Sequence, residues 1–281
     1  MMLEVSRTVR FCVNDPPTSP AKPHGGPARD NTFAAWPPIR GLGRYYELDV
    51  TCRGTADDRT GYFINIKHLD QAVQQHALPR IHRALARSAG SDNLPVGQLL
   101  RDMLADLQPP LRESVTRIVF RLTPTCRIAL RSHDMDHVLI RQQYEFSAAH
   151  RLHAPGLSDQ QNREIFGKCN NPAGHGHNYR LEVAVRLPID PDGRTADVEQ
   201  IDARVNRHAI ELLDHKHLNN DVPQFARLNP SVENIVKVVW DMLAVRFDDL
   251  GPGASLEELS VWETSKTVCT YRGPSPQPTT L

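Results

Sequence analysis

The second half of this 281-residue sequence repeats the pattern of the first half at an offset of about 132–136 residues. Three segments of the first half fall on counterparts in the second half: 41–50 on 174–183, 65–70 on 197–202, and 93–104 on 229–243. Two unrelated strand–helix units can look alike by chance, but this match extends over several segments in the same order. The sequence therefore predicts two modules with one fold, joined between Arg131 and His137.

Hydrophobic periodicity predicts the same α+β order, β-β-α-α-β-β, in both modules. Apolar residues alternate along 45–52 and 179–185, which is typical of strands. They follow helical spacing along 69–85, 198–213 and 232–247.

The expected boundaries are 1–135 for the first module, 136–273 for the second and 274–281 for a tail. Segment 14–38 contains seven prolines and two glycines. Proline removes a backbone donor and breaks helices and central strands. We therefore expect this segment to form a loop.

Composition argues for a folded, water-exposed chain with no strong attraction to polyanions. Hydrophobic residues make up 40% and charged residues 23%, and 33 basic residues balance 33 acidic ones. No apolar run approaches the ~18–20 residues of a membrane helix, and Glu4, Arg7 and Arg10 interrupt the place where a signal peptide would lie. The sequence predicts a cytoplasmic protein that binds neither nucleic acid nor membrane.

The five cysteines, Cys12, Cys52, Cys126, Cys169 and Cys269, are odd in number and contain no C-x-x-C pair. They do not predict a disulfide framework, and by default each is a small apolar side chain. Cys169 differs because it lies in a stretch rich in histidine and asparagine.

His175 and His177 have the spacing of a metal-ligand pair on a strand, because residues i and i+2 point to one face. A third ligand is available from either His150 or His153, which follow another strand-like run. Strand alternation places residues i and i+3 on opposite faces, which favours His150. Three neutral imidazoles suit Zn²⁺ and leave one position open, as in catalytic zinc sites.

Two other places carry acid–base groups. Asp214 precedes His215 at the end of a predicted helix, where a carboxylate can orient an imidazole. A cationic helix C-terminus would have the same sequence. Glu263 lies in an apolar strand, and a partly buried carboxylate there suits a heterocycle that offers two N–H donors, although a single strand glutamate often points to solvent.

Four motifs stand in order along the second module: F-S-A-A-H at 146–150, G-K-C-N-N-P-A-G-H-G-H-N-Y at 167–179, L-D-H-K-H-L-N at 213–219 and W-E-T at 262–264. Together they resemble the 6-pyruvoyltetrahydropterin synthase family and its relative, the 6-carboxytetrahydropterin synthase of queuosine biosynthesis. The resemblance covers Val138 to Gly273, about half of the chain.

This resemblance implies the tunnelling fold (T-fold): a four-stranded antiparallel sheet with two helices on one face, assembled between subunits into barrels. It also implies that zinc is bound by three histidines, His150, His175 and His177.

The resemblance further implies roles for five residues. Cys169 is expected to be a proton-transferring thiolate, aided by Asp214 and His215. Glu263 is expected to anchor the pterin, and Glu233 matches a second acidic residue that contacts it, although a valine precedes Glu233 where the family usually has Thr or Ser.

The resemblance leaves the reaction open. The substrate in both cases is 7,8-dihydroneopterin 3'-triphosphate, which loses triphosphate to form either 6-pyruvoyl-tetrahydropterin or, with release of acetaldehyde, 6-carboxy-tetrahydropterin. Five residues separate Cys169 from His175, as in the pyruvoyl enzymes, whereas the queuosine enzymes usually have three. This spacing favours the pyruvoyl product, with the carboxy product as the alternative. A pterin-binding scaffold without turnover is a third interpretation. Arg151 and Lys168 are candidate cations for the triphosphate.

The first module lacks this machinery, because Leu42 and Arg44 stand where the second module has His175 and His177. Its expected role is architectural. The resemblance implies that single-module relatives assemble six modules, so three two-module chains would suffice. We therefore expect a homotrimer, a pseudo-hexamer of modules.

Overall fold

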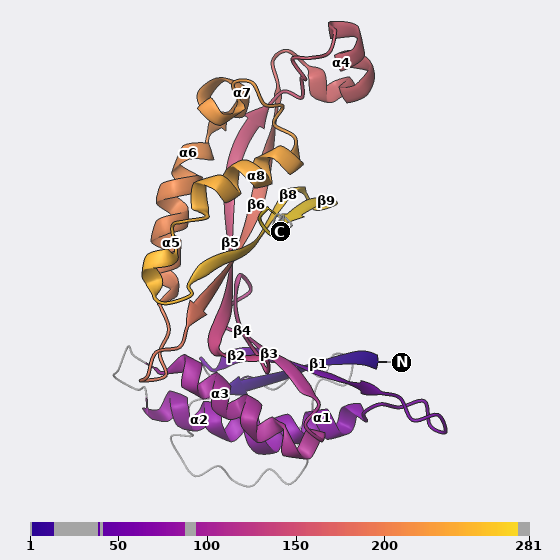
Figure 1. The fold of residues 1–281 in the computed structure, drawn as a ribbon, viewed down its shortest axis with the longest axis vertical. Helices are drawn as coiled ribbons and strands as arrows, with labels where there is room; N and C mark the ends of the chain where they lie inside the picture. Colours follow the sequence, from indigo (N-terminus) through magenta and orange to yellow (C-terminus); the bar gives the residue numbers. More distant parts are fainter. Residues whose placement is uncertain (1, 14–38, 40–41, 88–93, 275–281) are drawn as a thin grey trace, which may run out of the picture. The chain divides into compact units, whose positions relative to one another are not determined.

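The computed structural model describes residues 2–13, 39, 42–87 and 94–274 (Figure 1). The Pro-rich segment 14–38, which we expected to be a loop, lies outside the described residues, as does nearly all of the expected tail.

The described chain divides into two compact units. Unit 1 holds the residues up to Val138 together with Ile189–Thr195, and unit 2 holds Leu139–Pro188 with the residues from Ala196 onward. The loop 189–195 is tied to unit 1 by the Gln98 N–H, which donates to the Gly193 carbonyl at 2.9 Å.

Unit 1 is an antiparallel sheet with helices on one face (Figure 1). The strands pair in the order β1 (Met2–Val13), β2 (Arg44–Thr55), β3 (Val115–Arg121) and β4 (Cys126–Arg131), and β5 (Asp134–His150) begins in this unit. The helical elements are α1 (Ile66–Ala72), the π-helical turn η1 (Val73–Ala77), α2 (Leu78–Arg87), α3 (Val96–Leu107) and the 3-10 turn η2 (Pro109–Leu111).

Alternation along β2 explains which face of this sheet is covered. Leu48, Val50 and Cys52 are fully buried against the helices, and burial of one such side chain contributes roughly 1.5–3 kcal/mol. Asp49 points to the opposite face, where its carboxylate accepts hydrogen bonds from Arg121 of β3 at 2.9 and 3.1 Å. The period of two therefore separates an apolar face from a charged one.

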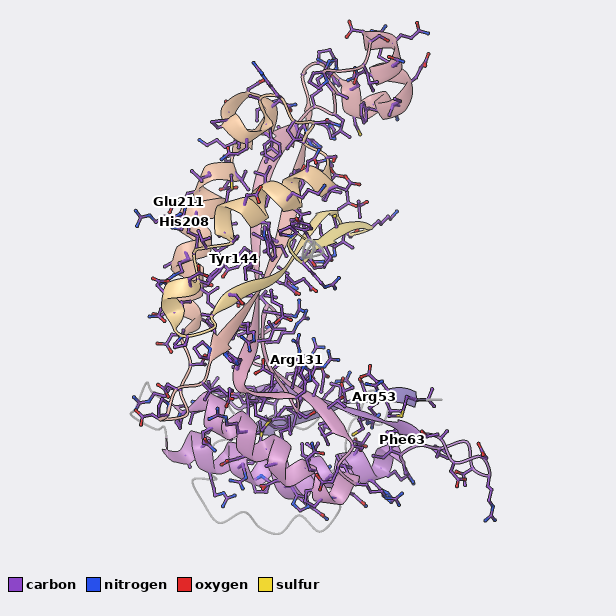
Figure 2. All side chains as sticks on the ribbon, viewed as in Figure 1. Arg53, Phe63, Arg131, Tyr144, His208 and Glu211 are labelled. Carbon is purple, nitrogen blue, oxygen red and sulfur yellow. The ribbon has the colours of Figure 1, made fainter. Side chains whose placement is uncertain are left out.

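Unit 2 has the same architecture with additional short elements. Its sheet has the order β5, β6 (His175–Pro188), β8 (Ser255–Thr264) and β9 (Thr267–Tyr271), and the two-residue strand β7 (Lys216–His217) pairs with β5 in parallel. Its helical elements are α4 (Asp159–Phe166), η3 (Gly167–Asn170), α5 (Val198–Val205), η4 (Asn206–Ile210), α6 (Glu211–Leu213), α7 (Leu218–Asp221), η5 (Pro223–Phe225), α8 (Val232–Leu243) and η6 (Asp248–Leu250). Tyr144, labelled in Figure 2, joins β5 to α5 through a 2.7 Å hydrogen bond from its hydroxyl to Asp202.

Two irregularities recur at matching places in the units. A π-helical turn interrupts the first long helix at 73–77 and again at 206–210, an offset of 133 residues. A β-bulge lies between Thr51 and Cys52 in β2 and between Ala184 and Val185 in β6, at the same offset. Neither irregularity is needed to form a helix or a strand, so their recurrence supports a duplicated module.

The α+β class predicted from periodicity is confirmed for both units. The helices expected over 69–85 and 198–213 are not uniform, however, because each contains a π-helical turn. Such a turn adds one residue to a helix, a change that apolar spacing averaged over many residues does not reveal. Among the described residues, no helix has the length and apolarity needed to span a membrane.

Candidate metal centre and active site

Three imidazoles of unit 2 converge at the ends of two strands. His150 is the last residue of β5, and His175 and His177 lie at the start of β6. One ring nitrogen of each lies within 4.8 Å of the other two, and the Nε2 atoms of His150 and His175 are 3.1 Å apart. Among the described residues, this is the one group of His, Cys, Asp and Glu side chains placed to share a metal ion.

The surroundings of His150 prepare it to act as a ligand. Its side chain is fully buried, and Nδ1 donates a 2.7 Å hydrogen bond to the carbonyl of Pro230. This bond assigns the ring proton to Nδ1 and leaves the Nε2 lone pair facing the other histidines. Burial lowers the pKa of His150 to about 4. The pKa of His175 is lowered mainly by burial and to a smaller extent by the neighbouring His177. The neutral forms that metals require therefore prevail near pH 7.

The donor set fits Zn²⁺. Two nitrogens on one tetrahedral zinc, each at about 2.0–2.1 Å, lie roughly 3.3 Å apart, close to the 3.1 Å between His150 and His175. The Nε2 atom of His177 is buried without a hydrogen-bond partner. A buried polar atom without a partner is costly, and a metal ion would satisfy it. His153 is not in the group: its Nδ1 accepts from Asn170 at 3.2 Å.

Glu263 lies beside this centre. It is the second-last residue of β8, and its Oε1 is 3.5 Å from His150 Nε2 and 3.9 Å from His177 Nε2. The Glu263 side chain is 20% exposed, so the carboxylate is mostly screened from water but can be reached by a ligand.

Asp214 and His215 form an oriented pair at the end of α6. Asp214 Oδ2 lies 2.8 Å from His215 Nδ1, and Oδ1 accepts from the Ser147 N–H at 2.8 Å. Both hydrogen bonds lower the pKa of Asp214, and the one from the Ser147 N–H has the larger effect. His215 adopts a left-handed conformation with φ 56°, and its ring is 83% exposed. A depression of about 620 Å³ contains His215 and His177 in its lining.

Cys169 lies on the 3-10 turn η3, half-buried, and its carbonyl accepts from the Leu152 N–H at 2.9 Å. No hydrogen bond among the described residues joins its thiol to Asp214 or His215. Glu233 lies in the first turn of α8, and hydrogen bonds from the Ser231 hydroxyl and from its own backbone lower its pKa. The described chain thus brings together the three histidines and Glu263, and it pairs Asp214 with His215.

Comparison with known proteins agrees with this geometry. Residues 139–274 match the model of the family described as 6-pyruvoyl tetrahydropterin synthase. A Poecilia reticulata protein named 6-pyruvoyl tetrahydrobiopterin synthase is 42% identical over 135 residues, which are 48% of this chain and 89% of that protein. The Homo sapiens protein of that name is 38% identical over 135 residues, 48% of this chain and 90% of that one.

This chain belongs to the 6-pyruvoyl tetrahydropterin synthase family. The match lies in the C-terminal half, and unit 1 is structured but unassigned. The solved structure of Caenorhabditis elegans 6-pyruvoyl tetrahydropterin synthase has 35% sequence identity, covers 49% of this chain and 96% of that one, and superposes with a TM-score of 0.44.

Three residues that shape the site of this family member were not assigned a role from the sequence. Pro230 fixes the His150 tautomer across 80 residues of sequence. Asn170 is buried and bonded to residues 151–153. His217 packs against Gly174, where a Cβ atom would lie 2.7 Å from its Nε2 and where φ is 75°. Asn170 and His217 lie inside the family motifs, which was the only signal for them, and Pro230 lies outside the four motifs.

Unit 1 carries none of the family's metal ligands at the matching positions. Glu47 pairs with Arg121 in the sheet of unit 1, and Arg180 pairs with Trp262 at the matching place in the sheet of unit 2. Counted along the chain from these matched pairs, Arg44 corresponds to His177 and Leu122 corresponds to Glu263. The described part of unit 1 therefore has no counterpart of this centre.

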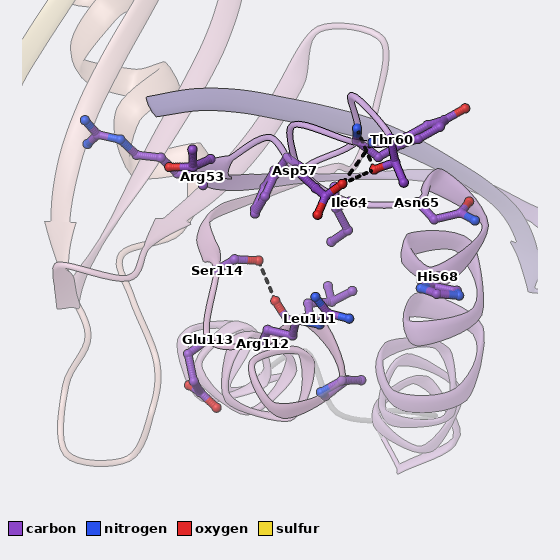
Figure 3. A pocket seen from close by; sticks show the side chains of 15 residues that line it. Arg53, Asp57, Thr60, Ile64, Asn65, His68, Leu111, Arg112, Glu113 and Ser114 are labelled. Carbon is purple, nitrogen blue, oxygen red and sulfur yellow. Dashed lines mark hydrogen bonds between the residues drawn. The ribbon is translucent and has the colours of Figure 1, made fainter. Parts of the chain in front are cut away.

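Unit 1 does have a hollow of about 630 Å³ between the end of β2, the start of α1 and the turn before β3 (Figure 3). Arg112 and His68 are among the residues that line it. The carboxylate of Asp57 is occupied by its own loop, since it accepts from the N–H groups of Arg59 and Thr60 at 3.0 and 2.9 Å. The hollow lacks a cluster of metal-ligating side chains among the described residues.

Proposed function

We propose that unit 2 is a zinc-dependent lyase that converts 7,8-dihydroneopterin 3'-triphosphate to 6-pyruvoyl-tetrahydropterin with release of triphosphate. The observation that carries this proposal is the convergence of His150, His175 and His177, with Glu263 beside them, in a member of the 6-pyruvoyl tetrahydropterin synthase family. The names of the relatives support the pyruvoyl product.

The three histidines would hold the metal in this proposal. Zinc bound there would act as a Lewis acid toward the hydroxyl groups of the substrate's side chain and favour loss of their protons. His150 is kept in position by Pro230, so its lone pair needs no rearrangement when a metal arrives.

Glu263 would recognise the pterin ring. A carboxylate accepts two N–H donors side by side, which is the pattern offered by the amino-pyrimidine part of a pterin. Its low exposure would strengthen these hydrogen bonds, because water competes less for a screened carboxylate.

Cys169 and the Asp214–His215 pair would move protons. Formation of the pyruvoyl side chain shifts more than one proton, so the thiol and the imidazole can act at different atoms and need not touch each other. Asp214 holds the His215 ring through Nδ1 and leaves Nε2 to face a substrate, as carboxylates do in triads.

We also propose that three chains form the working enzyme. β1 of unit 1 and β9 of unit 2 stand at the two ends of the strand order among the described residues. Exposed edges invite pairing with another chain, and a closed barrel removes them. Three two-module chains would supply six modules, the number that the resemblance implies for a closed stack of two barrels.

Mass analysis of the product made from 7,8-dihydroneopterin 3'-triphosphate tests the reaction. The proposal expects triphosphate and 6-pyruvoyl-tetrahydropterin. Release of acetaldehyde would identify the carboxy-forming synthase instead. Tight binding of a pterin without any turnover would identify a scaffold.

A further inference from the structure

Arg151, the residue after the metal-facing His150, reaches across to the turn that carries Cys169. Its guanidinium uses two donors on one partner: Nε donates to the Asn170 carbonyl at 3.0 Å, and Nη2 donates to Asn170 Oδ1 at 3.2 Å. A planar guanidinium with two parallel hydrogen bonds fixes its partner's orientation as well as its distance.

The backbone of Arg151 is fixed from the other side. The Arg151 N–H donates to Asn219 Oδ1 at 2.8 Å, and Asn219 Nδ2 donates to the Arg151 carbonyl at 3.0 Å. The guanidinium therefore extends from an anchored backbone.

Asn170 completes the connection. It is 5% exposed, its Nδ2 donates to the Leu152 carbonyl at 2.7 Å, and it also lies 3.2 Å from His153 Nδ1. The Leu152 N–H in turn donates to the Cys169 carbonyl at 2.9 Å. Residues 151–153 and 169–170 are thus joined by hydrogen bonds in both directions.

The turn needs such support because its own structure is weak. η3 has four residues and begins at Gly167, a glycine with a positive φ of 50°. Short 3-10 turns have poor hydrogen-bond geometry. Contacts from residues 151–153, through side chains and through the backbone, therefore help to hold Cys169 in place.

We propose that Arg151 and Asn170 are positioning residues that hold the Cys169 thiol in place relative to the histidine centre. We call their contacts the Arg151–Asn170 clamp. The catalytic part of this proposal rests on the proposed function, but the placement of Cys169 can be measured without it. The clamp also reassigns Arg151, which the sequence offered as a cation for the triphosphate, because two of its donors are already used within the protein.

Four variants separate the two roles of Arg151: Arg151→Lys, Arg151→Met, Asn170→Ala and the double variant Arg151→Lys/Asn170→Ala. A clamp requires the fork geometry, so Arg151→Lys should fail as Arg151→Met does. A residue that only attracts triphosphate would be rescued by lysine and would affect KM. Arg163→Ala, which removes an exposed arginine of α4, is the matched control.

The variants are compared in the full chain by zinc content, by kcat and KM, and by the alkylation rate of each cysteine with iodoacetamide followed by peptide mass spectrometry. We expect unchanged zinc, a kcat lowered about tenfold or more with little change in KM, and Cys169 labelled about tenfold faster, the scale of losing one hydrogen bond to a charged group. Cys12 and Cys269, which are half-buried, serve as internal references.

The double variant should be no worse than either single variant, because both remove the same contact. Unchanged Cys169 labelling in Arg151→Lys and Asn170→Ala overturns the clamp, and so does loss of zinc together with activity. If the unmodified chain shows no synthase activity, the proposed function fails, while labelling of Cys169 still decides the clamp. Arg151→Lys keeps the aliphatic stem and the charge, so it remains informative if other variants fold poorly.

Discussion

The Nε2 atoms of His150 and His175 lie 3.1 Å apart, although 25 residues separate them in sequence. Since Nδ1 of His150 is bonded to the Pro230 carbonyl, the neutral ring presents a lone pair at Nε2. At this distance a proton on His175 Nε2 can form a hydrogen bond to the His150 lone pair. When a metal is bound, each of the two nitrogens can donate its lone pair to the ion. The ends of β5 and β6 therefore hold a pair of ligands in place before an ion arrives.

One zinc per chain is the first expected result. His175→Ala should abolish zinc binding and activity together, because two imidazoles leave an incomplete set of ligands. Elemental analysis of the purified chain measures this. The control His82→Ala removes an exposed histidine of α2 in unit 1 and should leave the zinc content unchanged; two zinc ions per chain would contradict the assignment to unit 2.

Removal of the thiol should affect turnover and not the metal. Cys169→Ala is expected to retain zinc and to lower kcat by ~10²–10⁴-fold, the usual contribution of a positioned acid–base group. The comparison is Cys269→Ala, another half-buried cysteine of unit 2. An unchanged kcat in Cys169→Ala would show that the thiol only packs.

Glu263→Gln should weaken pterin binding, because the amide replaces one of two acceptor oxygens with a donor. KM and the quenching of pterin fluorescence report this loss. Glu263 also lies 3.5 Å from His150 Nε2, so zinc content must be measured in the same sample. Loss of zinc with unchanged pterin affinity would mean that Glu263 serves the metal and not the substrate.

Gly97→Ala should destabilise unit 1 by about 1–3 kcal/mol, since overpacking a filled core forces side chains and backbone to shift. A Cβ atom at Gly97 would lie 2.6 Å from Ile189 Cγ2 and 2.9 Å from the Gly193 carbonyl oxygen. Urea denaturation measures the change. Gly156→Ala, where a Cβ atom would meet nothing within 4 Å, should leave the midpoint where it is.

The mass of the assembly tests the trimer. One chain weighs 31.6 kDa, so three chains weigh 94.8 kDa and six weigh 189.6 kDa. Light scattering coupled to size-exclusion chromatography distinguishes these values. A hexameric mass would contradict the trimer and would indicate six assembled copies of unit 2, with unit 1 as an appendage.

Much of the fold could be predicted because it depends on local pattern. The helix expected from Val198 to Leu213 begins and ends at the residues where the helical elements α5, η4 and α6 begin and end. Apolar spacing predicted these ends because it shows which residues face the core. The spacing of His175 and His177 on one strand face, and their absence at the matching positions of unit 1, were also readable from the order of residues.

The sequence by itself thus determined the repeated α+β module, the histidine pair and the family motifs, because each depends on the spacing of residues along the chain. Only the tertiary structure decided that His150 lies against His175, that Pro230 sets the tautomer of His150, and that Arg151 contacts Asn170. These relationships link residues 19 or more positions apart. Chain closure brings such residues together through the packing of the whole unit, and no local periodicity encodes where it does so.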